Sequence, residues 1–140
     1  MPLFSPLLEQ AAELAAEWHD GTYRKGRWRE PVFVLADGTH PRIPMMAHVA
    51  TVAMTVQRAG FDDETIAAAY LHDTIEDAHA SGVQMRAEVL TNLVGERVVA
   101  LIRSVSEPVA APESPPLRWQ ERKDGYLDAL RAGSPCAAAI

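Results

Sequence analysis

The sequence predicts an all-α protein, a bundle of about six helices that forms a single domain. Three observations support this prediction. Apolar residues recur every three or four positions in several long segments, glycines and prolines separate these segments, and strand-like composition is limited to one stretch near residues 31–44. With 140 residues, the chain is long enough to bury one hydrophobic core.

The first predicted helix runs through SPLLEQAAELAAEWHD. Ser5 suits the N-cap position, Pro6 suits the first helical position, and Gly21 follows as a stop. Apolar residues share one face of this helix: Leu7, Leu8, Ala11, Leu14, Ala15 and Trp18. We expect that face to pack against the rest of the bundle.

Residues 31–44, PVFVLADGTHPRIP, have a different pattern. The run VFVL is β-prone, and Asp37-Gly38 is a turn signal between two short arms. Pro41 and Pro44 restrict the returning arm. We therefore expect a small β-hairpin-like insertion near residues 31–44 that protrudes from the helical body.

Five more helices are predicted after this insertion, each bounded by a cap, a glycine or a proline. The second begins after Pro44 and ends at Gly60, and the third begins at its cap Asp62 and continues through residue 78. The remaining three cover residues 83–94, 96–107 and about 118–132, with a proline-rich loop at 108–117 before the last.

The composition limits the classes of function. A net charge of −6 argues against broad binding to nucleic acid polymers. No apolar run approaches the ~20 residues of a membrane span, and the N-terminus lacks a signal-peptide pattern. The single cysteine, Cys136, cannot form an internal disulfide, which favours a reducing, cytoplasmic location. The cations of RKGRWR, residues 24–29, are either a binding site for a small polyanion or a solvated loop.

The stretch LHDTIED, residues 71–77, changes abruptly from apolar to charged. On a continuous helix, Asp73 and Asp77 would extend the apolar stripe, with His72 and Glu76 on the stripe beside it. Buried carboxylates need cations, hydrogen bonds or a metal as partners. The alternative is a helix that turns out into solvent after Tyr70, and the spacing alone does not decide between the two.

His48 is the second unusual residue, because it lies on the core-facing side of the second helix among valines and methionines. A lone histidine in such a place is more often a structural residue than a ligand. If the second and third helices are neighbours, however, His48, His72 and Asp73 converge. Two imidazoles and a carboxylate suit Mn, Fe, Zn or Ni, and Glu76 and Asp77 would lie close enough to orient or deprotonate a water.

These residues fall within motifs that resemble the HD-domain metal-dependent phosphohydrolases. Within them, the chain is similar to the RelA/SpoT-homologue type, which includes small stand-alone hydrolases of the guanosine polyphosphate (p)ppGpp. The similarity covers nearly the whole chain, in the segments AAEWHDGTYRKG, IPMMAHVATVA, GFDDETIAAAYLHDTIED, VGERVVALIRSVSE and WQERKDGYLDAL. It implies an HD-domain helical bundle.

The resemblance also implies roles for individual residues. His48, His72 and Asp73 match the metal ligands of the family, typically for Mn²⁺, with Fe, Ni or Zn as other possibilities. Glu76 and Asp77 match the pair that positions or activates the attacking water.

Arg24 and Lys25 match the residues of the family that contact the nucleotide, with the Arg24 guanidinium stacked on the base. Arg27 and Arg29 have no counterpart in the motif, and we interpret them as solvated or steering charges. His19 also matches the opening motif, and we expect a structural histidine there rather than a ligand.

The sequence departs from the family pattern in three places. Val49 stands where the family usually has a proline after the metal histidine, and Met45 stands where it usually has a tyrosine. The segment between Lys25 and Pro44 is longer than usual, so the insertion could reshape the mouth of the pocket. The fourth ligand of the family, an aspartate in A-D-K/R-L-H-N, would fall about one helical turn beyond Ile140. We therefore expect residues 1–140 to form a single HD domain, truncated before that motif.

The leading hypothesis is a metal-dependent 3′-pyrophosphohydrolase of the (p)ppGpp type, acting on its nucleotide through a metal-activated water. An HD phosphohydrolase for another nucleotide phosphate is one alternative. A degenerate, non-catalytic HD domain that binds a nucleotide or a partner protein is the other. The expected partner is a nucleotide, with no nucleic acid polymer and no membrane, and the sequence leaves the oligomeric state open.

Overall fold

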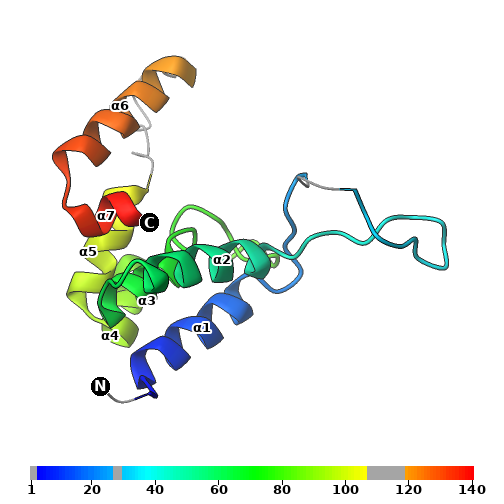
Figure 1. Ribbon diagram of the computed structural model, residues 1–140, viewed down its shortest axis with the longest axis horizontal. Coiled ribbons are helices and arrows are strands. Elements are labelled where there is room, and N and C mark those ends of the chain that lie inside the picture. The colour runs from blue at the N-terminus through cyan, green and yellow to red at the C-terminus, as the bar shows by residue number, and fades with distance from the viewer. Residues whose placement is uncertain (1–2, 27–29, 107–118) are drawn as a thin grey trace.

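A computed structural model describes residues 3–26, 30–106 and 119–140 of the chain (Figure 1). These residues form seven helices and no strand, which confirms the all-α prediction and adds one short helix to the six expected. The helices are α1 (Pro6–Trp18), α2 (Met45–Arg58), α3 (Asp63–Leu71), α4 (Ala87–Val94), α5 (Glu96–Val105), α6 (Trp119–Ala132) and α7 (Pro135–Ala139).

Side-chain caps define the starts of α1 and α3, where the sequence predicted them. Ser5 Oγ accepts a hydrogen bond from the Leu8 N–H at 3.4 Å. The Asp62 carboxylate accepts bonds from both the N–H and the hydroxyl of Thr65, at 3.0 and 2.6 Å. Each cap satisfies a donor that has no partner within its helix.

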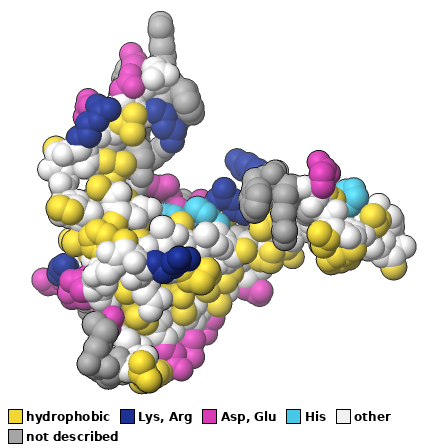
Figure 2. Space-filling view, viewed as in Figure 1, with side chains coloured by type: hydrophobic (Ala, Val, Ile, Leu, Met, Phe, Trp, Pro, Cys, Tyr) yellow, Lys and Arg dark blue, Asp and Glu magenta, His cyan; other side chains and the backbone are white. Residues whose placement is uncertain are grey.

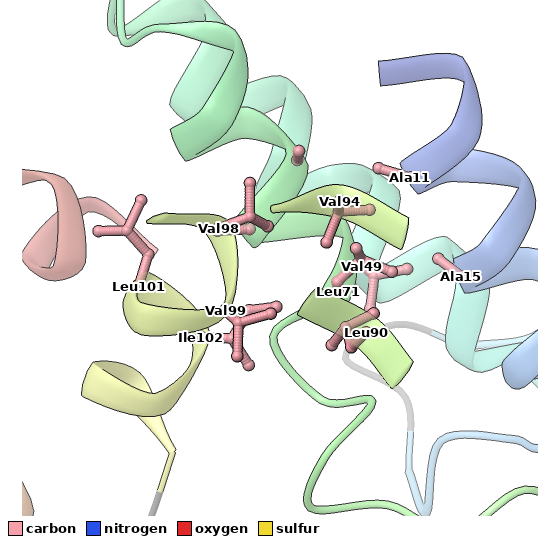
Figure 3. Close-up of a cluster of buried hydrophobic side chains, with 12 residues drawn as sticks. Ala11, Ala15, Val49, Leu71, Leu90, Val94, Val98, Val99, Leu101 and Ile102 are labelled. Atoms are coloured by element: carbon pink, nitrogen blue, oxygen red, sulfur yellow. The ribbon is translucent and has the colours of Figure 1, made fainter. Parts of the chain in front are cut away.

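Helix α3 lies at the centre of the bundle and packs against α1, α2 and α5. Six of its nine side chains are buried, and they lie on more than one face: Thr65, Ile66, Ala67, Ala68, Ala69 and Leu71. The alanines allow its neighbours to approach closely on both sides. Figure 3 shows the resulting core, in which Leu71 meets Val49 of α2 and Leu90 of α4, next to Ile102 of α5.

The C-terminal helices are less enclosed. Helix α7 packs against α5, whereas α6 projects away from the bundle (Figure 1). The proline-rich loop predicted at residues 108–117 lies outside the described residues. Across the described ranges, no helix has the length and apolar character needed to cross a membrane.

The segment between α1 and α2 extends away from the bundle as an arm, defined as residues 24–26 and 30–43 (Figure 1). The chain reverses direction at the predicted turn. There the Leu35 N–H donates to the carbonyl oxygen of Thr39 at 2.8 Å, and Gly38 adopts a φ of 82°, a value that favours glycine.

The predicted hairpin-like insertion near residues 31–44 is present as this reversal of the chain, but its two sides form no β-strands. In the described part of the chain, the only bridge is an isolated one between Tyr23 and Pro44, at the base of the arm. Prolines remove ladder donors, and a lone two-stranded pair is marginally stable in water. Hydrophobic side chains are accordingly exposed along the arm (Figure 2), with Val32, Phe33, Val34 and Leu35 between 43% and 79% accessible.

Candidate metal centre

The third helix ends at Leu71, so the prediction that it continues through residue 78 is wrong. Residues 72–77, here called the acidic turn, form consecutive turns instead. Both the N–H and the hydroxyl of Thr74 donate to the Leu71 carbonyl oxygen, at 3.0 and 2.7 Å, and the His72 ring bonds to the Ala69 carbonyl oxygen. These local bonds occupy acceptors that a continuing helix would need.

The side chains of His48, His72 and Asp73 converge at the end of α3. One carboxylate oxygen of Asp73, Oδ2, lies 3.2 Å from His72 Nε2 and 3.7 Å from His48 Nε2. The two imidazole rings are 5.3 Å apart and nearly perpendicular. Helices α2 and α3 are packed neighbours. This is the condition under which the sequence predicted that these three side chains converge.

The orientation of the His72 ring is set by the backbone. Its Nδ1 lies 2.7 Å from the carbonyl oxygen of Ala69, which can only accept, so Nδ1 carries the proton. In the neutral ring, Nε2 then presents a lone pair toward the Asp73 oxygen. Two electron-rich atoms at that separation require a positive charge between them, which a proton or a metal ion can supply.

The pKa values of the three groups reflect this arrangement. Burial alone would lower the pKa of His72, but the hydrogen bond and charge of Asp73 outweigh it and raise that pKa. Burial would likewise raise the pKa of Asp73, but its bond to His72 and the charges of the two imidazoles lower it. The pKa of His48 is lowered, by burial first and then by the charge of Arg24.

The three groups fit a divalent transition metal. Their ligand atoms all lie within 4.8 Å of one another, and they form the one such group among the residues that the structure describes. Ligand bonds of about 2.1 Å place two ligand atoms between roughly 3.0 and 4.2 Å apart, which is the range of both measured distances to Asp73. Three protein ligands leave positions open for water, as at catalytic metal sites.

Glu76 and Asp77 lie in the acidic turn, and both side chains are exposed. The Asp77 N–H donates to the Asp73 carbonyl oxygen at 2.9 Å, so the two acids stay close. Burial and the negative charge of Asp73 raise the pKa of Asp77, and nearby positive charges, Lys25 among them, offset this only in part.

Arg24 and Lys25 are exposed at the base of the arm. The Arg24 N–H donates to the Ile43 carbonyl oxygen at 2.8 Å, which holds this segment beside the start of α2. The charge of Arg24 acts on His48 and that of Lys25 on Asp77. Figure 2 shows histidine and basic side chains together where the arm meets the bundle. Arg27 and Arg29 lie outside the described residues.

The sequence interpretation gave little weight to two residues at the end of α1. His19 is only 3% exposed, and the charges of Asp73 and Asp77 act on it, although burial keeps its pKa below the ordinary value. Trp18 was assigned only to the apolar stripe, yet its indole contacts the acidic turn. Helical spacing could not reveal either relationship, because both depend on how α1 packs.

The chain belongs to the HD domain family, whose model matches residues 11–133. It is 38% identical over 64 residues to the guanosine-3′,5′-bis(diphosphate) 3′-pyrophosphohydrolase of Aquifex aeolicus (strain VF5), a match that covers 46% of this chain and 8% of that protein. A metazoan orthologue of SpoT, described as hydrolysing ppGpp, has a similar fold. The TM-score is 0.71 at 24% identity, covering 99% of this chain and 66% of that one. This chain therefore spans only part of each relative.

Proposed function

We propose that this HD domain is a metal-dependent phosphohydrolase that removes the 3′-diphosphate of a guanosine polyphosphate such as ppGpp. The observation that carries the proposal is the position of His48 and His72, whose Nε2 atoms lie 3.7 and 3.2 Å from the same Asp73 oxygen. The names of the two relatives support the choice of substrate.

In this proposal, His48, His72 and Asp73 hold a divalent cation. Such a cation, when bound, lowers the pKa of water and neutralises charge on phosphate oxygens. Asp77 or Glu76 accepts a proton from the attacking water, and the raised pKa of Asp77 suits a proton acceptor. Water adds to the phosphorus attached to the ribose 3′ oxygen, and that P–O bond breaks. The proton that the acid accepted passes to the 3′ oxygen, which becomes a hydroxyl of the nucleotide, and pyrophosphate is released.

Arg24 and Lys25 would bind the nucleotide. Both are exposed beside the candidate metal centre, and their charges act on its members. The planar Arg24 guanidinium can stack on a purine, and the Lys25 ammonium can neutralise phosphate charge.

We take Mn²⁺ as the first metal to test, with Fe, Ni and Zn as comparisons, because a mixed set of imidazole and carboxylate ligands accepts all four. We further propose that the protein acts in the cytoplasm, where a chain with one free cysteine stays reduced.

The direct test is to incubate the protein with Mn²⁺ and ppGpp and to measure the release of pyrophosphate. We expect release by the wild-type protein and none by Asp73→Ala, with His40→Ala, an exposed arm residue outside the candidate metal centre, as the control. A metal-loaded wild-type protein that releases no pyrophosphate from ppGpp would contradict the assignment.

The arm favours a second candidate, an HD phosphohydrolase for another nucleotide phosphate. The arm begins at Arg24 and Lys25, next to the candidate metal centre. An arm longer than is usual in the family could therefore make room for a different nucleobase or phosphate chain. A panel of nucleoside polyphosphates, assayed with the same metal, separates the two candidates.

The third candidate is a non-catalytic HD domain that binds a nucleotide or a partner protein. The observation in its favour is the number of ligands. Three groups converge among the described residues, whereas the family pattern has four ligands. A protein that purifies without metal and takes up no Mn²⁺ in a titration would support this candidate over both enzymes.

A further inference from the structure

We propose that Trp18 is a positioning residue, which holds the far end of the acidic turn so that the Asp77 carboxylate faces the metal ligands. Its indole Nε1–H donates to the main-chain carbonyl oxygen of Asp77 at 2.8 Å, across 59 positions of sequence. This inference rests on the proposed function, in which Asp77 handles the attacking water.

The Trp18 indole also lies against a ring that follows the acidic turn. The Trp18 ring lies 5.6 Å from the ring of His79, centroid to centroid, in a tilted arrangement. His79 is itself held in place, because its Nδ1 lies 2.7 Å from Ser81 Oγ and its N–H donates to the Val83 carbonyl oxygen at 2.9 Å. The indole therefore contacts two nearby positions of this segment, the Asp77 carbonyl oxygen and the His79 ring.

The two ends of the acidic turn are held differently. At the near end, Thr74 is fully buried and bonds twice to the Leu71 carbonyl oxygen. At the far end, the side chains of Glu76 and Asp77 are exposed, so core packing does not fix them. The indole bond from α1 supplies a fixed point at that end.

The end of α1 is also bonded to the segment that carries His48. Thr22 donates through its N–H and its hydroxyl to the His19 carbonyl oxygen, at 3.0 and 2.6 Å. The first residue of α2, Met45, then donates to the Thr22 carbonyl oxygen at 3.0 Å. The residues at the end of α1 therefore set the position of Asp77 relative to a ligand on α2.

The test replaces Trp18 with phenylalanine, which keeps an aromatic ring and removes the donor. In Trp18→Phe we expect kcat for ppGpp to fall about tenfold, because small misplacements of a reacting group are costly. We expect Mn²⁺ affinity to stay within about twofold, because the indole bonds to Asp77 and is not an outer partner of a proposed metal ligand. Hydrogen exchange of residues 72–79 should become roughly five- to tenfold faster, as expected for one lost hydrogen bond. Exchange in α2 should not change.

His79→Ala is the matched control, since it removes the ring contact and keeps the indole donor. We expect its kcat to stay within about twofold of the wild-type value, because the hydrogen bond remains. An equal loss of kcat in both variants would overturn the proposal, as would a general rise in exchange with a parallel loss of Mn²⁺ affinity.

The exchange measurement separates this proposal from the proposed function. Unchanged exchange of residues 72–79 in Trp18→Phe would overturn the positioning role, whatever the activity. Faster exchange limited to those residues, in a protein whose wild type releases no pyrophosphate, would sustain the anchoring role and reject the proposed function. If the variant does not fold, hydrogen exchange of the Trp18 indole N–H is measured in the wild-type protein instead. Exchange as fast as that of a free indole would show that the bond to Asp77 is absent and would overturn the proposal.

Discussion

The Nε2 atom of His72 lies 3.2 Å from Asp73 Oδ2, although the two residues are adjacent in the sequence. In a continuous helix, neighbouring side chains point about 100° apart. The helix ends at Leu71, but the backbone of His72 keeps helical dihedral angles, with φ −58° and ψ −32°. The conformations of the two side chains therefore bring these atoms together at the end of α3.

Loss of a ligand should weaken metal binding. We expect His48→Ala, His72→Ala and Asp73→Ala each to lower Mn²⁺ affinity by more than about tenfold. Loss of a residue that only bonds to a metal ligand already costs about that much, and loss of the ligand itself should cost more. Isothermal titration with Mn²⁺ measures this directly. His40→Ala should bind like the wild type, and wild-type affinity in all three ligand variants would refute the assignment.

Metal affinity should depend on pH through His72. Its pKa is raised above the ordinary value of 6.5, so below and somewhat above that pH a proton occupies the position that a metal would need. Affinity for Mn²⁺ should therefore increase as the pH rises through the neutral range, with release of protons. Titrations in buffers of different ionisation enthalpy measure that release, and a flat pH profile would count against a role for His72 as a ligand.

The proposed stacking of Arg24 predicts that lysine cannot replace it. Arg24→Ala and Arg24→Lys should both raise the KM for ppGpp by about tenfold, because an ammonium group lacks the planar face of the guanidinium. Steady-state kinetics with Mn²⁺ measure the effect. Arg58→Ala, at the distal end of α2, is the control, and full rescue by lysine would show that Arg24 acts only through its charge.

The cap of α3 should contribute measurably to stability. Asp62 accepts two bonds from Thr65 and an ion pair from Arg97 at 2.8 Å. We expect Asp62→Ala to lower the free energy of unfolding by about 1 kcal/mol, a typical value for an N-cap. Urea denaturation measures this loss, with Asp63→Ala as the control, and equal losses in the two variants would rule out a specific capping effect.

Local signals in the sequence predicted much of the fold. The starts of α1 and α3 were predictable from their caps, Ser5 and Asp62. Each cap bonds to a residue only three positions further along the chain, so the signal is local. The end of α3 was mispredicted because helical spacing takes no account of the Thr74 and His72 side chains, which bond to the backbone of the preceding turn. The insertion predicted near residues 31–44 reverses direction as expected but forms no β-strands, because neither side of it has a partner beyond the other.

The candidate metal centre was predictable only in part. His72 and Asp73 stood out as polar residues at the end of a buried helix, but the approach of His48 depends on the packing of α2 against α3. The contact between Trp18 and Asp77 joins residues 59 positions apart. No spacing rule connects such residues, because the relationship arises from tertiary packing.

The buried face of α3 has a consequence for the spacing of the metal ligands. Ala69 packs against Ala53 and Val56 of α2, in the contact that brings His48 to Asp73. The methyl groups in this contact therefore help to set the separation of α2 and α3, and with it the distance from His48 to Asp73. Because Ala69 and Ala53 are both buried, larger side chains there should push the two helices apart and lengthen that distance.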